Sequence, residues 1–95
     1  LQVALDDLIE WEGLRRLDYV KIDAEGAESD ILAGGQKSLA KYRPIVQLEV
    51  NKFAVSQRLV DYARFKAPHS SNEIWFPNEH PRRSVALDLG WRQID

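Results

Sequence analysis

The sequence predicts an α/β fold in which strands joined through helices pair in parallel and a terminal hairpin adds antiparallel strands at one edge. Two apolar, strand-like runs, 19–23 and 45–50, are separated by helical segments, and strands joined in this way pair in parallel through right-handed crossovers. Two shorter strand-like runs follow at 62–66 and 73–76, with the turn-forming residues 67–72 between them. Because the chain has 95 residues, we expect these elements to form one small domain.

Helices are predicted before, between and after the strands. Asp6 and Asp7 precede an apolar run, and an aspartate side chain in this position accepts hydrogen bonds from the free N–H groups of a helix start. We therefore expect a short helix over 6–12, with Gly13 as its C-terminal stop. The other predicted helices are 27–32, 36–42, 52–60 and 82–89, and 91–94 is expected to form a tail.

Composition and charge narrow the class of protein. Apolar residues make up 44% and charged residues 29% of the chain, which is typical of a folded domain and excludes a disordered one. A net charge of −2 provides no basic excess for nucleic-acid binding. The chain has no cysteine for disulfides or zinc sites, and no apolar run approaches the roughly 20 residues of a membrane helix. We therefore expect a cytoplasmic protein with neither nucleic-acid nor membrane partners.

Carboxylates gather at the ends of the two predicted parallel strands. Asp23, Glu25 and Glu28 fall within six residues immediately after the first strand. Glu49 lies near the end of the second strand, and Asn51 follows it. Ligands bind beyond the carboxyl ends of strands in open α/β sheets, and neighbouring strands lie about 4.8 Å apart. The pattern therefore predicts that Asp23 and Glu49 face one cleft.

Three kinds of role remain open for these acids. A carboxylate beside other carboxylates has a raised pKa and accepts a proton near neutral pH. Clustered carboxylate oxygens also bind Mg²⁺ or Ca²⁺. A purely structural role is the third: Glu25 and Glu28 would satisfy the free N–H groups of a helix start, and Glu49 would form an ion pair with a basic side chain such as Lys21.

The segment from Val20 to Glu28, Val-Lys-Ile-Asp-Ala-Glu-Gly-Ala-Glu, resembles the hallmark of the FkbM family of methyltransferases. The similarity extends to 4–9, 31–35 and 43–51, and the layout of the final hairpin agrees. This resemblance implies a Rossmann-like class I methyltransferase sheet, of which residues 1–95 would supply the fourth to the seventh strand. It also implies transfer of a methyl group from S-adenosylmethionine to an oxygen of a small molecule or sugar, with no metal expected.

The resemblance also implies roles for individual residues. Asp23 and Glu25 would line the site beside the methyl donor, and Glu49 would approach the acceptor. Either Asp23 or Glu49 would accept the hydroxyl proton as methyl transfer proceeds. Asn51 would orient the acceptor through a hydrogen bond.

The chain departs from the family pattern in one respect. It has no glycine-rich turn directly after a strand, which is the turn that approaches the cofactor, and no acidic residue about 20 positions later. Gly34-Gly35 is no substitute, because it lies between two helical segments. The chain also contains no methionine. We therefore expect residues 1–95 to be the C-terminal half of the domain, without the cofactor-binding half and inactive alone.

Two other functions are compatible with the sequence. A half-sheet leaves an open strand edge, so the chain could be an assembly module that pairs with other chains or forms a homodimer. Alternatively, Asp23, Glu25 and Glu49 could bind a divalent metal for hydrolysis.

Overall fold

The computed structural model describes residues 4–22, 28–49, 59–68 and 70–94, and the structural statements below concern these residues. Its elements run in the order helix, strand, two helices, three strands, helix and strand. They are α1 (Leu5–Glu12), β1 (Tyr19–Ile22), α2 (Glu28–Ala33), α3 (Gln36–Tyr42), β2 (Ile45–Glu49), β3 (Tyr62–Lys66), β4 (Asn72–Pro77), α4 (Arg83–Asp88) and β5 (Arg92–Gln93). The α/β class predicted from the sequence is confirmed.

The described strands form one sheet in the order β1-β2-β4-β3-β5. β1 and β2 pair in parallel, as expected for strands joined through α2 and α3. β4 pairs antiparallel with both β2 and β3, so the predicted hairpin extends the sheet from β2 outward. Among the described strands, β1 and β5 therefore occupy the two outer edges of the sheet.

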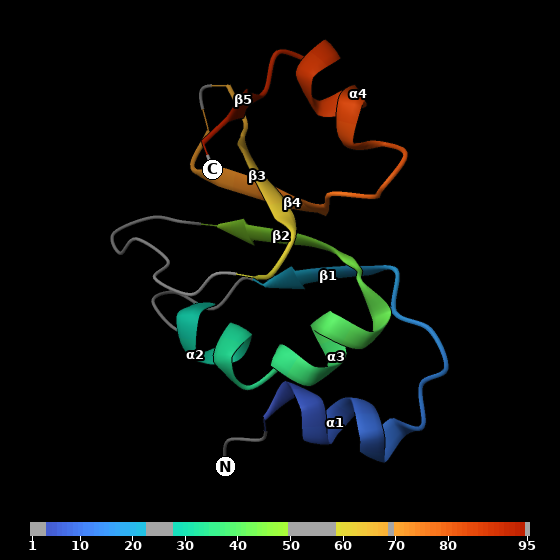
Figure 1. The fold of residues 1–95 in the computed structure, drawn as a ribbon. Coiled ribbons are helices and arrows are strands. Elements are labelled where there is room, and N and C mark those ends of the chain that lie inside the picture. The colour runs from blue at the N-terminus through green and yellow to red at the C-terminus, as the bar shows by residue number, and fades with distance from the viewer. Residues whose placement is uncertain (1–3, 23–27, 50–58, 69, 95) are drawn as a thin grey trace.

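Helices cover the two faces of the sheet unequally. In Figure 1, α1, α2 and α3 lie on the β1 side, whereas α4 lies at the opposite end beside β5. The larger apolar core joins one sheet face to α2 and α3, because side chains two residues apart on a strand share a face. Its buried members are Ile22, Leu32, Leu39, Val46, Leu48, Leu59 and Trp75.

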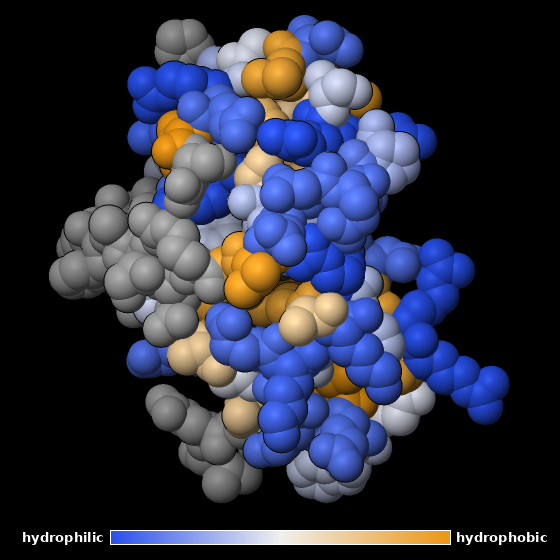
Figure 2. Space-filling model, in the orientation of Figure 1, coloured by the Kyte–Doolittle hydropathy of each residue, from blue (hydrophilic) through white to orange (hydrophobic). Residues whose placement is uncertain are grey.

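A second apolar core lies on the other sheet face, under α4. Phe65 and Phe76 meet there edge to face, with ring centroids 5.8 Å apart. Its buried members are Ala63, Phe65, Phe76 and Ala86, and Ile45, Ile74 and Trp91 pack against them. Two cores on opposite faces hold the hairpin firmly against β2. Hydrophilic side chains cover much of the described surface that faces the viewer in Figure 2, with an apolar patch near its middle.

The acid predicted to cap the first helix caps a different one. α1 begins at Leu5 after Ala4, and no side chain caps it. The Asp6 carboxylate instead accepts hydrogen bonds from the backbone N–H groups of Ser38 (2.8 Å) and Lys37 (3.1 Å) in the first turn of α3. Burial raises the pKa of Asp6, but these bonds outweigh it, so the pKa lies below its ordinary value. Asp6 thus fastens α1 to α3.

The double glycine permits the close contact between these helices. The Gly34 carbonyl accepts a 2.9 Å hydrogen bond from the Asp6 N–H. A Cβ atom on Gly35 would lie 2.7 Å from Cδ2 of Leu5, so the Leu5 side chain would have to shift to accommodate it. The prediction that Gly34-Gly35 breaks the helix is confirmed, since it lies between α2 and α3.

Two further predictions differ from the structure or lie outside it. The expected tail at 91–94 contains β5, which pairs antiparallel with β3. The predicted helix over 52–60 falls mostly outside the described residues. Within the described ranges, no helix has the length and apolar character needed to cross a membrane.

Candidate active site

The parallel pairing of β1 and β2 brings the ends of both strands to one edge of the sheet. Their register runs from Tyr19 opposite Ile45 to Ile22 opposite Leu48. Figure 1 shows both arrows pointing the same way, so the carboxyl ends lie side by side. This is the position where open α/β sheets bind ligands.

Glu49 is the last residue of β2 and is half-buried at this edge. Its register partner on β4 is Asn72. Because strand side chains alternate, Glu49 lies on the face opposite to the buried Leu48 and shares its face with Gln47. The structure therefore places Glu49 at the predicted edge, away from the larger core.

Near Glu49, this face of β1 and β2 carries polar side chains, whereas Ile45 at the other end of β2 packs against the second core. The Tyr19 hydroxyl donates a hydrogen bond to Oε1 of Gln47, and burial raises the pKa of Tyr19 above its ordinary value. Lys21, suggested as an ion-pair partner of Glu49, is exposed and lies opposite Gln47 in the register. A polar face that includes Glu49 suits a ligand with hydroxyl groups better than an apolar one.

The other predicted site residues, Asp23, Glu25 and Asn51, lie outside the described residues. Asp23 is the next residue in the chain after Ile22, which ends β1, and Asn51 comes two residues after Glu49. The prediction that Asp23 and Glu49 share a cleft stays a prediction.

Glu28 has a more specific environment than its sequence position suggested. It begins α2 and is only 6% exposed, one helical turn before the fully buried Leu32. A carboxylate that served only as an exposed first-turn acid would remain in water, because burial of a charge is costly. The i, i+4 spacing to Leu32 was the available signal that Glu28 lies on the inner face of α2. Glu28 is therefore a buried acid of α2 and not an exposed first-turn acid.

The hairpin contributes a buried polar cluster that the sequence analysis missed. Oε1 of Glu73 accepts hydrogen bonds from Nη2 of Arg64 (2.8 Å) and from Nε1 of Trp75 (3.0 Å). The Arg64 guanidinium also lies 4.7 Å from the centre of the Trp75 ring. Glu73 is the register partner of Leu48, so the cluster fixes β4 against the strand that carries Glu49. The signal was the charged Arg64 and Glu73 among apolar neighbours in two strands.

The arrangement provides carboxylates for proton transfer or hydrogen bonding. Among the described residues, no group of three or more side chains could hold a metal ion. A half-buried carboxylate such as Glu49 accepts hydrogen bonds from hydroxyl groups and can take a proton from one. The metal-hydrolase alternative gains no support from this part of the chain.

Comparison with known proteins identifies the class as methyltransferase. The profile of the methyltransferase FkbM domain matches residues 2–76, which run from before α1 to the end of the hairpin. The chain therefore belongs to the FkbM methyltransferase domain family, and the resemblance seen in the sequence is confirmed.

One curated relative is an O-methyltransferase. Over 39 residues the chain is 46% identical to the 2-O-methyltransferase NoeI of Sinorhizobium fredii (strain NBRC 101917 / NGR234). The aligned stretch covers 41% of this chain and 16% of the relative, so the chain corresponds to a small part of that protein. No solved structure matches the chain.

Proposed function

We propose that residues 1–95 form the C-terminal half of a cytoplasmic, S-adenosylmethionine-dependent O-methyltransferase domain that acts on a hydroxyl group of a small molecule or sugar. The observation that supports this most is the parallel pairing of β1 and β2 in a member of the FkbM family. That pairing directs Glu49, and the chain that leads to Asp23, toward one edge of the sheet. The likeness to a 2-O-methyltransferase supports an oxygen acceptor.

The acids of this edge suit both the cofactor and the acceptor. S-adenosylmethionine supplies a methyl group on a positively charged sulfur. In our proposal Asp23 and Glu25 hold the cofactor, because carboxylate oxygens accept hydrogen bonds from ribose hydroxyls and favour a nearby positive charge. Glu28, which follows this segment in the chain, is itself a buried carboxylate.

Glu49 and Asn51 are proposed to act on the acceptor. The Glu49 carboxylate, or that of Asp23, takes the proton of the acceptor hydroxyl while the oxygen gains the methyl group. The Asn51 amide orients the hydroxyl, so that the reacting atoms meet in line. The proton ends on the carboxylate and passes to water after the product leaves.

The free outer edge of β1 supports the proposal that another half completes the domain. β1 is parallel to β2 and lies at the edge of the described sheet, with unpaired backbone groups available to a further strand. We propose that the cofactor-binding half pairs along β1. The 95-residue chain alone would then bind S-adenosylmethionine weakly and transfer no methyl group.

Calorimetry tests the division into halves. S-adenosylmethionine is titrated into the 95-residue chain and into the longest natural polypeptide that contains it. We expect saturable binding only to the longer polypeptide. Tight binding to the 95-residue chain would contradict the half-domain proposal and leave the methyltransferase assignment standing.

Substitutions in the longer polypeptide test the residue roles. We expect Glu49→Gln to lower kcat about 10²- to 10⁴-fold, as for loss of a general base, with little change in cofactor affinity. Asp23→Asn should weaken cofactor binding as well. Asp88→Asn, which removes an exposed acid from α4, is the matched control and should change neither quantity. Full activity in the Glu49→Gln variant would exclude Glu49 as the base.

A further inference from the structure

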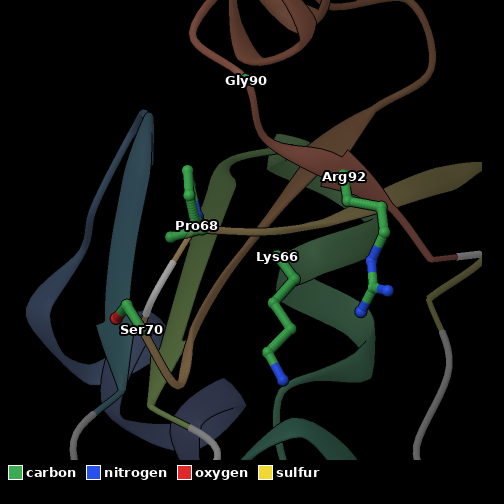
Figure 3. A pocket seen from close by; sticks show the side chains of 6 residues that line it. Lys66, Pro68, Ser70, Gly90 and Arg92 are labelled. Atoms are coloured by element: carbon green, nitrogen blue, oxygen red, sulfur yellow. The ribbon is translucent and has the colours of Figure 1, made fainter.

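A pocket of about 320 Å³ lies where the turn between β3 and β4 meets the start of β5 (Figure 3). It is lined by Lys66, Ala67, Pro68, Ser70, Gly90 and Arg92. This volume is at the lower end of the range for small-molecule sites. The pocket is thus large enough for a small ligand or for one charged group of a larger one.

Two cations line the pocket from neighbouring strands. Lys66 of β3 and Arg92 of β5 are register partners, so their side chains leave the sheet on the same face. Figure 3 shows both side chains extending in the same direction from their strands. Like charges directly opposite each other on paired strands destabilise a sheet. The fold therefore carries a cost at this position that a bound anion would offset.

None of the described residues that line the pocket carries a carboxylate that could neutralise these cations. Glu73, the register partner of Lys66 on β4, is already bound by Arg64 at 2.8 Å and by Trp75 at 3.0 Å. Among the described residues, no ion pair involves Lys66 or Arg92. The chain as a whole carries a net charge of −2, so this local excess of positive charge runs against the general balance.

The remaining polar group of the pocket suits the same ligand. Oγ of Ser70 accepts a 3.1 Å hydrogen bond from the Asn72 N–H and so orders the turn. A hydroxyl that accepts in this way still has its own hydrogen to donate. The planar guanidinium of Arg92 binds two oxygens of one anion, and Lys66 adds a compact charge. Lys66 and Arg92 therefore offer charged donors to a ligand, and Ser70 adds a hydroxyl group to the lining.

We propose that this pocket binds an oxyanion, namely a phosphate or sulfate group, either as the free ion or as an ester on a small ligand. The site does not depend on methyl transfer. Gly90 and Arg92 lie beyond residues 2–76, the part matched by the family profile, whereas the other lining residues lie within it, so the matched part alone does not form the whole pocket.

Titration with inorganic phosphate and with inorganic sulfate tests the site directly. Each ion replaces chloride at constant ionic strength, so that general screening stays fixed. We expect saturable amide NMR shifts at Lys66, Ala67, Ser70 and Gly90, with a Kd on the order of 1 mM, and a rise in Tm with ion concentration. Absence of saturable shifts at these residues would overturn the proposal.

Charge-removing variants separate a specific site from general attraction. We expect Lys66→Gln and Arg92→Gln each to weaken phosphate binding about fivefold or more. Each variant should keep or raise the Tm without phosphate, because one of two opposed cations is gone. Arg16→Gln makes the same change in net charge at an exposed residue outside the pocket and should leave the affinity unchanged. Equal loss in all three variants would show nonspecific attraction and refute the site.

A sugar phosphate and the matching uncharged sugar distinguish the two sources of the anion. Tighter binding of the sugar phosphate than of inorganic phosphate assigns the pocket to an ester, and equal binding assigns it to the free ion. Binding of the uncharged sugar with the same affinity as the sugar phosphate would contradict recognition of an anion.

Discussion

Arg43 connects the end of α3 to residues 60–62 and to Glu79, and its replacement gives the sharpest test of the fold. It follows α3 in the left-handed region, with φ of 51°. Its guanidinium donates to the backbone carbonyls of Val60 (2.7 Å) and Asp61 (2.9 Å) and forms a two-pronged pair with Glu79. It also lies 4.7 Å from the centre of the Tyr62 ring.

The expected cost of Arg43→Ala follows from these contacts. Each of the two carbonyl bonds contributes about 1 kcal/mol, and the contact with the Tyr62 ring about 0.5 kcal/mol. The free energy of unfolding should therefore fall by about 2.5 kcal/mol, and the Tm by roughly 10–20 °C for a domain of this size. The value of about 2.5 kcal/mol does not include the pair with Glu79, whose carboxylate is exposed.

Comparison of Ala with Gly at position 43 separates the side chain from the backbone. A residue with a Cβ atom pays about 1 kcal/mol in the left-handed region, whereas glycine does not. Arg43→Gly should consequently be about 1 kcal/mol less destabilising than Arg43→Ala. Urea denaturation followed by tryptophan fluorescence measures both. Arg16→Ala, at an exposed pair with Asp18, is the control and should cost less than about 0.5 kcal/mol.

The same contact predicts a pH effect. Hydrogen bonding to Arg43 lowers the pKa of Glu79 to about 2. A depressed carboxyl pKa adds stability above the unfolded value and loses it as the pH falls. The difference in stability between the wild type and Arg43→Ala should therefore shrink between about pH 4.5 and pH 2. The account of Arg43 would be refuted if Arg43→Ala lowered the free energy of unfolding by less than about 0.5 kcal/mol. It would also be refuted if Arg43→Gly were less stable than Arg43→Ala.

Three further predictions concern the helices, the hairpin and the sheet edge. Asp6→Ala should lower the free energy of unfolding by about 1 kcal/mol in thermal denaturation, because α3 loses its cap. In the wild type, the stability that this cap contributes should be lost at low pH, as acid protonates the Asp6 carboxyl, whose pKa is lowered. Glu73→Ala should lower the free energy of unfolding in urea by about 3 kcal/mol, since it removes a partner from the buried Arg64. The double variant Glu73→Ala with Arg64→Met should lose less stability than Glu73→Ala alone. The 95-residue chain should dimerise along β1 in sedimentation equilibrium, and a monomer at every concentration would contradict the proposal of an open edge.

The strands were predictable because their signals are local. The apolar runs at 19–23 and 45–50, with helices between them, sufficed to predict the parallel pair, and the turn formers at 67–72 predicted the hairpin. β5 was missed because its two residues, Arg92 and Gln93, have no strand pattern and are ordered only by pairing with β3. Short elements depend on tertiary partners more than on their own sequence.

Side-chain roles that depend on distant partners could not be predicted. Asp6 has a sequence context typical of a helix cap, but its partners are 31 and 32 residues away on α3. The burial of Glu28 depends on how α2 packs on the sheet. Of the four predicted site residues, Glu49 lies at the predicted edge, and the shared cleft with Asp23 remains a prediction.

The order of strands also has a consequence for engineering. Glu49 ends β2, whereas Arg92 begins β5, three strands further along the sheet. At about 4.8 Å per strand their backbones are separated by roughly 14 Å. Energetic effects of changes this far apart usually add, so the C-terminal segment can be redesigned or exchanged with little thermodynamic effect on the acidic edge.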